Sequence, residues 1–449
     1  MIDKLPTIAA ISTPLGESGL GVIRISGIRS LEILSLITKT KKKNILSRKS
    51  YLKILWDKAQ NMPIEQAVVT YYKAPKSYTG EDMAEISTHG SLVLLKYILE
   101  IIIKHGAILS PPGEFSKRAF INGKMDLSQA EGVINLIKAK TKLSAGYAFE
   151  QVKGKLYNAI KDIRKDLIDV LAKIEVSLDF DEDMGVIDKQ EFLKKIKKAL
   201  GEIKKLKETY NEGRIIKEGI KILILGRPNV GKSTLLNALL REERAIVTNI
   251  PGTTRDTIEE AIDINGIPAI LIDTAGLSST KNYIEKLGQI KAKNKIIYSD
   301  LILFICEANK QITKKDEVIL KSIKEKEIIK VFNKEDLVKG KKNNKNGIYI
   351  SAKNGTGIEK IKKEIEKYIG NRIFERNNSI VLNVRHYECL VRAEESLLGL
   401  VKTIKNKDIT LDLNAIELKE AIKALGEISG EEVSEEVINK IFEEFCIGK

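Results

Sequence analysis

Short apolar runs separated by turn residues dominate the first part of the chain. Within residues 1–120 the runs TIAAIST, GVIRIS and AVVTYY are rich in β-branched residues and are bounded by Gly and Pro, which is typical of β-strands. One longer apolar stretch, SLVLLKYILEIIIKHG, lies among them and predicts a helix that ends at Gly106. This mixture of strands and helix predicts an α+β domain.

From about residue 125 to residue 215 the spacing of apolar residues becomes helical. In the stretch FLKKIKKALGEIKKL, lysines occupy one helix face, and the opposite face collects four apolar residues: Phe192, Ile196, Leu200 and Ile203. The acidic stretch LDFDEDMG, at 178–185, interrupts the pattern. We therefore expect a break between two helices there.

Between residue 217 and about residue 370, strand-like and helix-like segments alternate. The apolar runs KILILG, AILIDTAG, LILFICE, EIIKVFNK and GIYISAK each end in small or polar residues. This alternation predicts a doubly wound parallel sheet, whose ligand residues lie at the C-terminal ends of the strands. After residue 380 the helical pattern returns in CLVRAEESLLGLVKTIK and AIELKEAIKALGEI. The chain is thus predicted to hold a helical region that is split by an inserted α/β domain.

Composition limits the classes of protein to consider. A chain of 449 residues with 43% hydrophobic residues is long enough for two or three domains with sizeable cores. The formal net charge of +15 indicates a polyanionic partner such as nucleic acid. Because 62 Lys and only 14 Arg carry the excess, and Ile and Asn are also abundant, a bias towards A/T-rich codons explains the charge equally well.

The sequence also indicates where the protein works. No apolar run reaches the roughly 18 residues that a membrane helix needs, and MIDKLPTIAAISTPLGE is too short and too interrupted for a signal peptide. The three cysteines form neither a disulfide framework nor a zinc site, and the three histidines lack metal-ligand spacing. We therefore expect a cytoplasmic protein with no membrane partner. These residues are Cys306, Cys389 and Cys446, and His89, His105 and His386.

The most specific motif is GRPNVGKS, Gly226 to Ser233, which matches the phosphate loop of P-loop nucleotide hydrolases. It follows the predicted strand KILIL and opens the predicted helix TLLNALL, as the motif requires. Gly226 and Gly231 let backbone amides turn towards phosphates. Lys232 can reach the β- and γ-phosphates as a catalytic cation, and Ser233 can ligate Mg²⁺. The start of the helix adds a favourable dipole.

Two further motifs supply the γ-phosphate side of such a site. In PGTTRD, Thr253 and Thr254 lie in a loop after the first helix, where a hydroxyl can cap Mg²⁺. In DTAG, Asp273 can hold Mg²⁺ through water and the Gly276 amide can sense the γ-phosphate. Leu277 stands where a Ras-like enzyme has the glutamine that orients the attacking water, so another group must do so or hydrolysis is slow.

The base side of the site is formed by NKED and SAK. Asp336 can accept hydrogen bonds from the guanine N1–H and 2-amino groups, and Asn333 can meet the purine edge. Adenine lacks that amino group, so the site should prefer GTP to ATP by orders of magnitude. The predicted GTP-binding residues are Asn229, Val230, Gly231, Lys232, Ser233, Thr234, Thr248, Asn249, Ile250, Pro251, Gly252, Thr253, Thr254, Asp273, Thr274, Ala275, Gly276, Asn333, Lys334, Asp336, Ser351, Ala352 and Lys353.

Beyond these motifs, several segments together resemble the MnmE (TrmE) family of tRNA modification GTPases. They are TIAAISTPLGESGLGVIRISG, SYTGEDMAEISTHG, PPGEFSKRAFINGKMDLSQAEGV, GRPNVGKSTLLN, PGTTRD and the terminal FCIGK, and they span essentially the whole chain. The resemblance implies a multidomain fold. Its parts are an α+β folate-binding-like N-terminal domain (1–120), an all-α helical domain in two pieces (121–215 and 373–449) and an inserted α/β P-loop GTPase domain (216–372).

The resemblance also implies an activity. Such a protein forms a homodimer through its N-terminal domain and joins an FAD-containing partner of the MnmG (GidA) type in a heterotetramer. Together they add an aminomethyl-type (carboxymethylaminomethyl) group to carbon 5 of the wobble uridine of tRNA. A tetrahydrofolate derivative, 5-formyl- or methylene-tetrahydrofolate, supplies the one-carbon unit. FAD belongs to the partner, while GTP, Mg²⁺ and K⁺ belong to the GTPase.

The resemblance also assigns site residues, by their positions within the shared motifs. The folate contacts are Arg24, Glu85, Lys124 and Lys449. Cys446 of FCIGK becomes part of the modifying centre, although an inert, partly buried cysteine is the alternative; prenylation is excluded because Gly448 and Lys449 are poor residues for it. From the residues alone, Arg24 and Glu85 are also consistent with an ordinary cross-strand pair.

The resemblance implies how hydrolysis proceeds without a glutamine. Two GTPase domains meet on a K⁺ ion that substitutes for an arginine finger, and Ser233 and Thr254 ligate Mg²⁺. Glu285 matches the catalytic glutamate, although the following LGQIKAK departs from the family pattern and a solvated helix charge is the alternative. Ser18 and Ser91 replace glycines that are usual near the folate site. The predicted K⁺ ligands are Asn229, Thr248, Ile250 and Thr253.

The sequence leaves two other hypotheses open. An Era-like ribosome-assembly GTPase shares the GTPase motifs and the positive charge, but it would need an RNA-binding module such as a KH domain, and none is evident outside the GTPase segment. A folate-dependent enzyme that GTP regulates, with no role on RNA, is the third hypothesis. Tight tRNA binding with a steep dependence on salt would exclude it.

Overall fold

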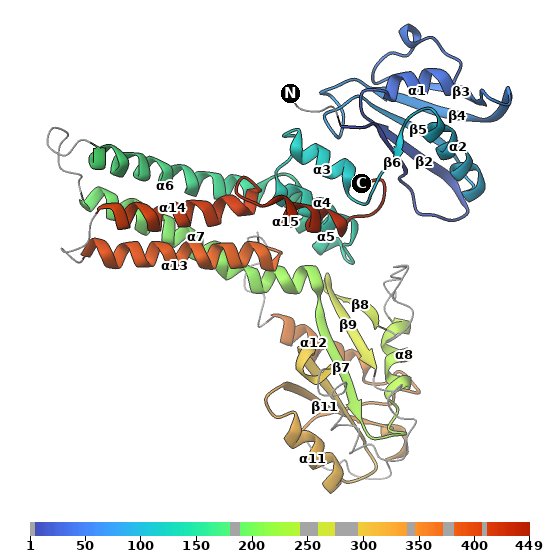
Figure 1. Cartoon of the computed structure of the whole chain (residues 1–449). Coiled ribbons are helices and arrows are strands. Elements are labelled where there is room, and N and C mark those ends of the chain that lie inside the picture. Colours follow the sequence, from blue (N-terminus) through green and yellow to red (C-terminus); the bar gives the residue numbers. More distant parts are fainter. Residues whose placement is uncertain are drawn as a thin grey trace. The chain divides into compact units, whose positions relative to one another are not determined.

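The computed structural model describes residues 5–179, 189–242, 259–273, 295–338, 346–370, 381–405 and 411–449 (Figure 1). The chain forms two compact units. The first unit combines the beginning of the chain with its end, and the second unit holds most of the middle. Unit 1 comprises Met1–Ile134, Gln151–Ile196 and Ser396–Lys449, and unit 2 comprises Asn135–Glu150 and Lys197–Glu395.

Unit 1 begins with a six-stranded sheet in the order β3-β4-β5-β2-β1-β6, drawn in blue in Figure 1. Apolar side chains of helices α1 and α2 pack on one face of this sheet and form its core. The predicted α+β domain is therefore present. Its elements are β1 (Ile8–Ile11), β2 (Ser18–Ser26), α1 (Ser30–Ile37), η1 (Lys42–Asn44), β3 (Ser50–Asp57), β4 (Met62–Tyr72), β5 (Met83–Gly90), α2 (Leu92–Lys104) and β6 (Ile108–Leu109).

The two faces of this sheet differ because side chains alternate along a strand. On β4, Val69 and Tyr71 point into the core under the helices and are buried. Val68, on the opposite face, is paired in register with Leu52 of β3, and both are exposed. In the described part of unit 1 this second face therefore presents apolar side chains to the surface.

The remaining described elements of unit 1, with those that join it to unit 2, are helical. Helices α6 and α14, far apart in the sequence, run side by side, and α15 packs on α3 (Figure 1). Helix α6 ends at Asp179 and α7 begins at Lys189, and residues 180–185 of the predicted break lie outside the described residues. The helices are α3 (Glu114–Ile121), α4 (Leu127–Ile137), α5 (Lys142–Val152), α6 (Lys155–Asp179), α7 (Lys189–Glu218), α13 (Val384–Lys405), α14 (Leu411–Ser429) and α15 (Glu435–Glu443).

One detail of the helical prediction is wrong. Phe192, Ile196 and Ile203 are buried along α7 as predicted, but Leu200 is only half-buried, and Ala199 takes its place in the core. The buried stripe advances by three or four residues at each step, and the residue that follows position 196 on it is 199. Leu200 lies at the edge of the stripe.

Unit 2 contains a second six-stranded sheet, in the order β12-β11-β10-β7-β9-β8. Helices α8 and α12 cover one face of it and α11 covers the other, so the central strands are buried on both sides. This explains why they are continuous apolar runs. The elements are β7 (Ile220–Gly226), α8 (Lys232–Glu242), β8 (Glu259–Ile264), β9 (Ile267–Asp273), β10 (Leu301–Glu307), α11 (Lys314–Ser322), β11 (Glu327–Asn333), η3 (Glu335–Leu337), β12 (Ile348–Tyr349) and α12 (Ile358–Gly370).

The second sheet is mixed, whereas the sequence predicted a wholly parallel one. The five predicted strands are parallel to their neighbours, but β8 was not predicted and pairs antiparallel with β9. Asn265 (φ +52°) and Gly266 (φ +86°) form the turn between the two strands. Asn-Gly is the preferred two-residue hairpin turn, so the sequence did carry a signal for β8.

Candidate functional sites

The loop between β7 and α8 is shaped by two residues with left-handed backbone, Asn229 (φ +64°) and Gly231 (φ +96°). A Cβ on Gly231 would lie 2.2 Å from Nδ2 of Asn333, so only glycine fits there. Gly226 is required for a different reason from the predicted one. A Cβ on Gly226 would lie 2.5 Å from the carbonyl oxygen of Ile305, because β7 and β10 are close neighbours at this point.

Lys232 is the first residue of α8 and is only 6% exposed. Its Nζ donates to the carbonyl oxygens of Gly226 at 3.1 Å and of Arg227 at 3.0 Å. The ammonium group is therefore held inside the loop. Ser233 and Thr234 follow it on the first turn of the helix and are exposed. Backbone N–H groups at the start of a helix favour anions, so this end of α8 suits phosphate.

Asn333, the last residue of β11, connects this loop to the second predicted loop. Its Nδ2 donates to the carbonyl oxygen of Val230 at 2.9 Å, and its Oδ1 accepts from the Ala352 amide at 2.9 Å. The side chain is 3% exposed. Asn333 thus fixes the phosphate loop and the SAK loop relative to each other, while its predicted contact with a purine edge stays a prediction.

Lys334 makes a second link to the phosphate loop. It has left-handed backbone (φ +64°), and its Nζ donates to the carbonyl oxygen of Asn229 at 2.7 Å and pairs with Glu307. Burial raises the pKa of Glu307, but hydrogen bonds from Lys310 and Lys334 outweigh it, so the pKa is lowered overall. Sequence analysis missed Glu307. Its signal was a carboxylate at the C-terminal end of the buried strand LILFICE.

Asp336 lies just beyond β11, with its carboxylate exposed. Ser351 Oγ donates to its Oδ1 at 2.6 Å, and this hydrogen bond lowers the pKa of Asp336 despite a smaller opposing effect of desolvation. Asp336 is therefore ionised and can accept hydrogen bonds. Ala352, buried beside Ser351, is held by Asn333, and Lys353 is exposed on the same loop.

The γ-phosphate side of the site is only partly described. Asp273 ends β9 and is paired in register with Ile224 of β7, so DTAG begins beside the phosphate loop. Among the described residues, no cluster of His, Cys, Asp and Glu could hold a metal ion. The predicted residues outside the described ranges are Thr248, Asn249, Ile250, Pro251, Gly252, Thr253, Thr254, Thr274, Ala275, Gly276 and Glu285.

A second group of predicted residues meets in unit 1. Arg24 of β2 and Glu85 of β5 are partners in the sheet register, and Arg24 Nε donates to Glu85 Oε1 at 2.8 Å. They form the cross-strand pair that the sequence allowed. Tyr72 Oη also donates to Glu85, at 3.4 Å to Oε2. The pair is partly buried, with the two side chains 20% and 25% exposed.

The C-terminal tail reaches this pair. Arg24 Nη1 donates to the carbonyl oxygen of Gly448 at 3.4 Å. Burial and the nearby Arg24 charge lower the pKa of Lys449, with Cys446 and Glu85 acting in the opposite direction. Cys446 is exposed, so the alternative of a partly buried cysteine is wrong. Three of the four predicted folate residues are thus brought together.

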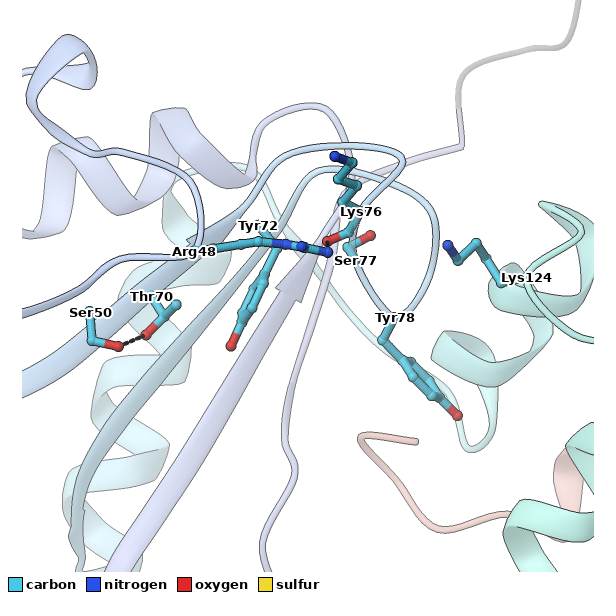
Figure 2. Close-up of a pocket in the computed structure, with 8 residues that line it drawn as sticks. All are labelled: Arg48, Ser50, Thr70, Tyr72, Lys76, Ser77, Tyr78 and Lys124. Carbon is cyan, nitrogen blue, oxygen red and sulfur yellow. Dashed lines mark hydrogen bonds between the residues drawn. The ribbon is translucent and has the colours of Figure 1, made fainter. Parts of the chain in front are cut away.

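The fourth, Lys124, lines a pocket of about 490 Å³ next to them (Figure 2). Two further cations, Arg48 and Lys76, and the rings of Tyr72 and Tyr78 also line it. Figure 2 shows Arg48 lying beside Ser77, with Lys124 reaching towards them from a separate segment. The remaining lining residues are the hydroxyl-bearing Ser50, Thr70 and Ser77.

The pocket and the Arg24–Glu85 pair share their tyrosines. Tyr72 bonds to Glu85, and the Arg24 guanidinium carbon lies 5.8 Å from the centre of the Tyr78 ring. Burial raises the pKa of Tyr78 although Ser116 and Arg24 act against it, so its hydroxyl stays protonated. Tyr78 Oη lies 2.7 Å from Ser116 Oγ.

A buried arginine supports the loop that carries Tyr78. Arg118 of α3 is 1% exposed and pairs with Glu81 at 3.1 Å and Glu114 at 2.9 Å. Glu81 also accepts from Ser26 Oγ at 2.7 Å. These contacts fix the segment between β4 and β5 against α3. Sequence analysis missed Arg118, because nothing local in EFSKRAF distinguishes a buried arginine from a surface one.

Comparison with known proteins covers both units. Residues 127–446 match the family model described as the MnmE helical domain, and residues 7–124 match the one described as the GTP-binding protein TrmE N-terminus. The chain is 44% identical over 451 residues to "tRNA modification GTPase MnmE" of Aquifex aeolicus, which covers 98% of this chain and 99% of that protein. It is 42% identical over 459 residues to the protein of the same name from Carboxydothermus hydrogenoformans, with 99% of each chain covered.

A solved structure of Era from Aquifex aeolicus, bound to GDP and AlF4⁻, is also similar to this chain. The identity is 29%, and the match covers 40% of this chain and 67% of that chain, with a TM-score of 0.27. One family model matches the chain before the phosphate loop and the other spans that loop from residue 127 to residue 446, and a ribosome-assembly GTPase would not account for these matches.

Proposed function

Since the chain belongs to the MnmE family of tRNA modification GTPases, we propose that it hydrolyses GTP in the course of modifying the wobble uridine of tRNA. The observation that supports the GTPase part of this proposal is the connection made by Asn333. It ties the phosphate loop at Val230 to the SAK loop at Ala352, and so couples phosphate binding to base recognition.

Base recognition rests on Asp336. Its lowered pKa keeps the carboxylate ionised, and its exposure lets it accept from the guanine N1–H and 2-amino groups. Adenine offers no such pair of donors, and the resulting unpaired carboxylate would reject ATP. GTP is therefore the nucleotide that we assign to this site.

Phosphate chemistry rests on the start of α8. Lys232, buried inside the loop, would transfer its contacts from the loop carbonyls to the β- and γ-phosphates. The exposed Ser233 hydroxyl is an oxygen ligand of the kind that Mg²⁺ prefers, and it would hold that ion together with Thr254. The bound Mg²⁺ neutralises charge on the transferring phosphate.

We further propose that K⁺ takes the place of an arginine finger. The exposed Asn229 side chain offers its amide oxygen as a ligand, and it would hold K⁺ together with Thr248, Ile250 and Thr253. A cation there stabilises charge that develops on the phosphate oxygens in the transition state. Glu285 would orient the attacking water, a task that Leu277 cannot perform.

The donor of the one-carbon unit would bind at the group of predicted folate residues in unit 1. The Arg24–Glu85 pair, the partly buried Lys449 and Lys124 would bind a 5-formyl- or methylene-tetrahydrofolate, with Glu85 accepting from pterin N–H groups and the cations meeting carboxylates. Cys446 is exposed beside them, where it could take part in the modification. An FAD-containing partner of the MnmG type would supply the redox chemistry, in a heterotetramer.

Dimerisation would use the part of the second face of the first sheet that is exposed on β3 and β4. Leu52 and Val68 are neighbours there, 62% and 42% exposed, and a second copy would bury them. Among the described residues, no helix is both long and apolar enough to cross a membrane. From the family we propose that the protein works in the cytoplasm.

The test is GTP turnover by the full chain in K⁺ and in Na⁺ at equal ionic strength, followed by analysis of wobble uridines in cells that lack the protein. A large preference for K⁺ and the loss of the modified uridine support the proposal. Equal turnover in both salts would remove the K⁺ mechanism. Unchanged uridine modification would overturn the function in tRNA.

A further inference from the structure

The pocket beside the folate residues has more positive charge than the folate contacts predicted from the sequence would require. Arg48, Lys76 and Lys124 all line it, and none of its described lining residues is acidic. Only Lys124 was predicted as a folate contact. Arg48 and Lys76 are thus two cations in a small pocket without an assigned role.

Two of these cations, Arg48 and Lys124, are held by the loop between β4 and β5, and Lys76 is an exposed residue of that loop. Arg48 Nη2 donates to the carbonyl oxygen of Lys76 at 3.1 Å, and Lys124 Nζ donates to that of Pro75 at 3.1 Å. Arg48 has left-handed backbone (φ +63°), a conformation that L-residues rarely adopt, and its amide is tied to the Tyr71 carbonyl at 2.7 Å. The charges of Arg48 and Lys124 are therefore already positioned at the pocket, and the Lys76 side chain starts from the same loop (Figure 2).

The shape of the pocket limits its occupant. About 490 Å³ accommodates a small ligand or a short flexible chain, whereas an RNA backbone needs an extended groove. The hydroxyls of Ser50 and Thr70 lie 2.9 Å apart, so this pair keeps one O–H that suits a carboxylate or amide oxygen. The tyrosines that line the pocket also lie beside Arg24 and Glu85, so the pocket adjoins the predicted folate residues.

We propose that this pocket binds the γ-linked glutamate tail of a polyglutamylated folate, with Arg48 and Lys76 meeting the carboxylates beyond the first glutamate. This rests on the proposed folate function of the adjoining residues. Each added glutamate brings one more carboxylate, and the lining of the pocket offers cations that can pair with it. The protein would then select the polyglutamate form of its one-carbon donor.

The test uses 5-formyl-tetrahydrofolate with one glutamate and with three γ-linked glutamates as probes. Their dissociation constants are measured by calorimetry on the full chain at low ionic strength. We expect the triglutamate to bind about tenfold more tightly, a gain that falls as salt is added. In Lys76→Gln most of this gain is lost. Lys73→Gln, an exposed lysine of the same segment that does not line the pocket, keeps it.

The binding measurements distinguish a failure of the glutamate-tail assignment from a failure of the folate site itself. Equal affinity for both probes, or equal effects of Lys73→Gln and Lys76→Gln, would overturn the tail assignment and leave the folate site intact. No binding of either probe would overturn the folate site and the tail assignment together. If Lys76→Gln instead weakens tRNA binding and not the triglutamate, the cations serve RNA phosphate and the proposal is wrong.

Discussion

Arg24 and Gly448 are separated by 424 positions in the chain, yet the Arg24 guanidinium donates to the Gly448 carbonyl oxygen at 3.4 Å. The contact places the C-terminal tail on the first sheet of the same unit. It also explains the glycine, since Gly448 has φ +83° and a Cβ there would lie 2.7 Å from Ser12. The tail is therefore shaped to complete a site that the N-terminal strands begin.

Gly448→Ala should displace the tail. The left-handed backbone costs an alanine about 1–2 kcal/mol, before the clash with Ser12 is counted. We expect 5-formyl-tetrahydrofolate to bind about tenfold or more weakly, with GTP turnover unchanged, as measured by calorimetry and phosphate release. Gly201→Ala is the control, because a Cβ on that helical glycine meets nothing within 4 Å. Unchanged folate affinity in Gly448→Ala would show that the tail does not form the site.

Docking of the tail should become more favourable as the pH rises. The pKa of Lys449 is lowered by burial and by Arg24, so between this value and the ordinary 10.5 the unfolded chain binds more protons than the folded one. Stability therefore increases with pH through that window. Relative to Lys449→Met, the wild type should gain free energy of unfolding as the pH rises towards the ordinary lysine pKa of 10.5. A pH-independent difference in free energy of unfolding between the wild type and Lys449→Met would contradict the assignment.

Asn333→Ala should separate the phosphate loop from the base loop. Two buried hydrogen bonds are lost, to Val230 and Ala352, each contributing about 1 kcal/mol, so GTP affinity should fall about 30-fold or more. Fluorescent GTP titration measures this. Asn354→Ala, on the exposed part of the same loop, should bind GTP normally. Equal affinities for the two variants would mean that the loops hold their positions without Asn333.

Asp336→Asn should reverse the preference for the base. The asparagine amide presents donors to the guanine N1–H and amino groups, which are also donors, so GTP affinity should fall by about 100-fold. Xanthosine triphosphate, which has a carbonyl in place of the amino group, should bind better to the variant than GTP does. Competition titrations of both nucleotides provide the measurement. Glu335→Gln, the neighbouring carboxylate, serves as control. If GTP still binds Asp336→Asn more tightly, another residue recognises the base.

Leu52→Lys should weaken the proposed dimer. It places a charge on the exposed apolar face beside Val68, where a second copy would have to bury it. Sedimentation velocity at micromolar concentration should show a shift from dimer towards monomer. Val93→Lys changes an apolar residue of α2 that is 80% exposed and should not alter the association state. A dimer that survives Leu52→Lys must use a different surface.

The amino-acid sequence determined the parts of this protein whose chemistry is local. GRPNVGKS lies within one strand–loop–helix unit, so its glycines, lysine and serine could be placed from the residues alone, and the apolar runs predicted the parallel strands that frame it. Asn265 and Gly266 held the signal for β8 as well. Local rules of backbone conformation and burial suffice in such cases.

Only the tertiary structure decided which distant residues meet. Nothing in GVIRIS or FCIGK indicates by itself that Arg24 bonds to the backbone of Gly448. Nor could a pattern separate Arg48 and Lys76, which line a pocket, from the many other lysines and arginines of a chain whose net charge is +15. Such contacts depend on strand register and on helix packing across hundreds of residues. Many side chains fix these together, and no single segment encodes them.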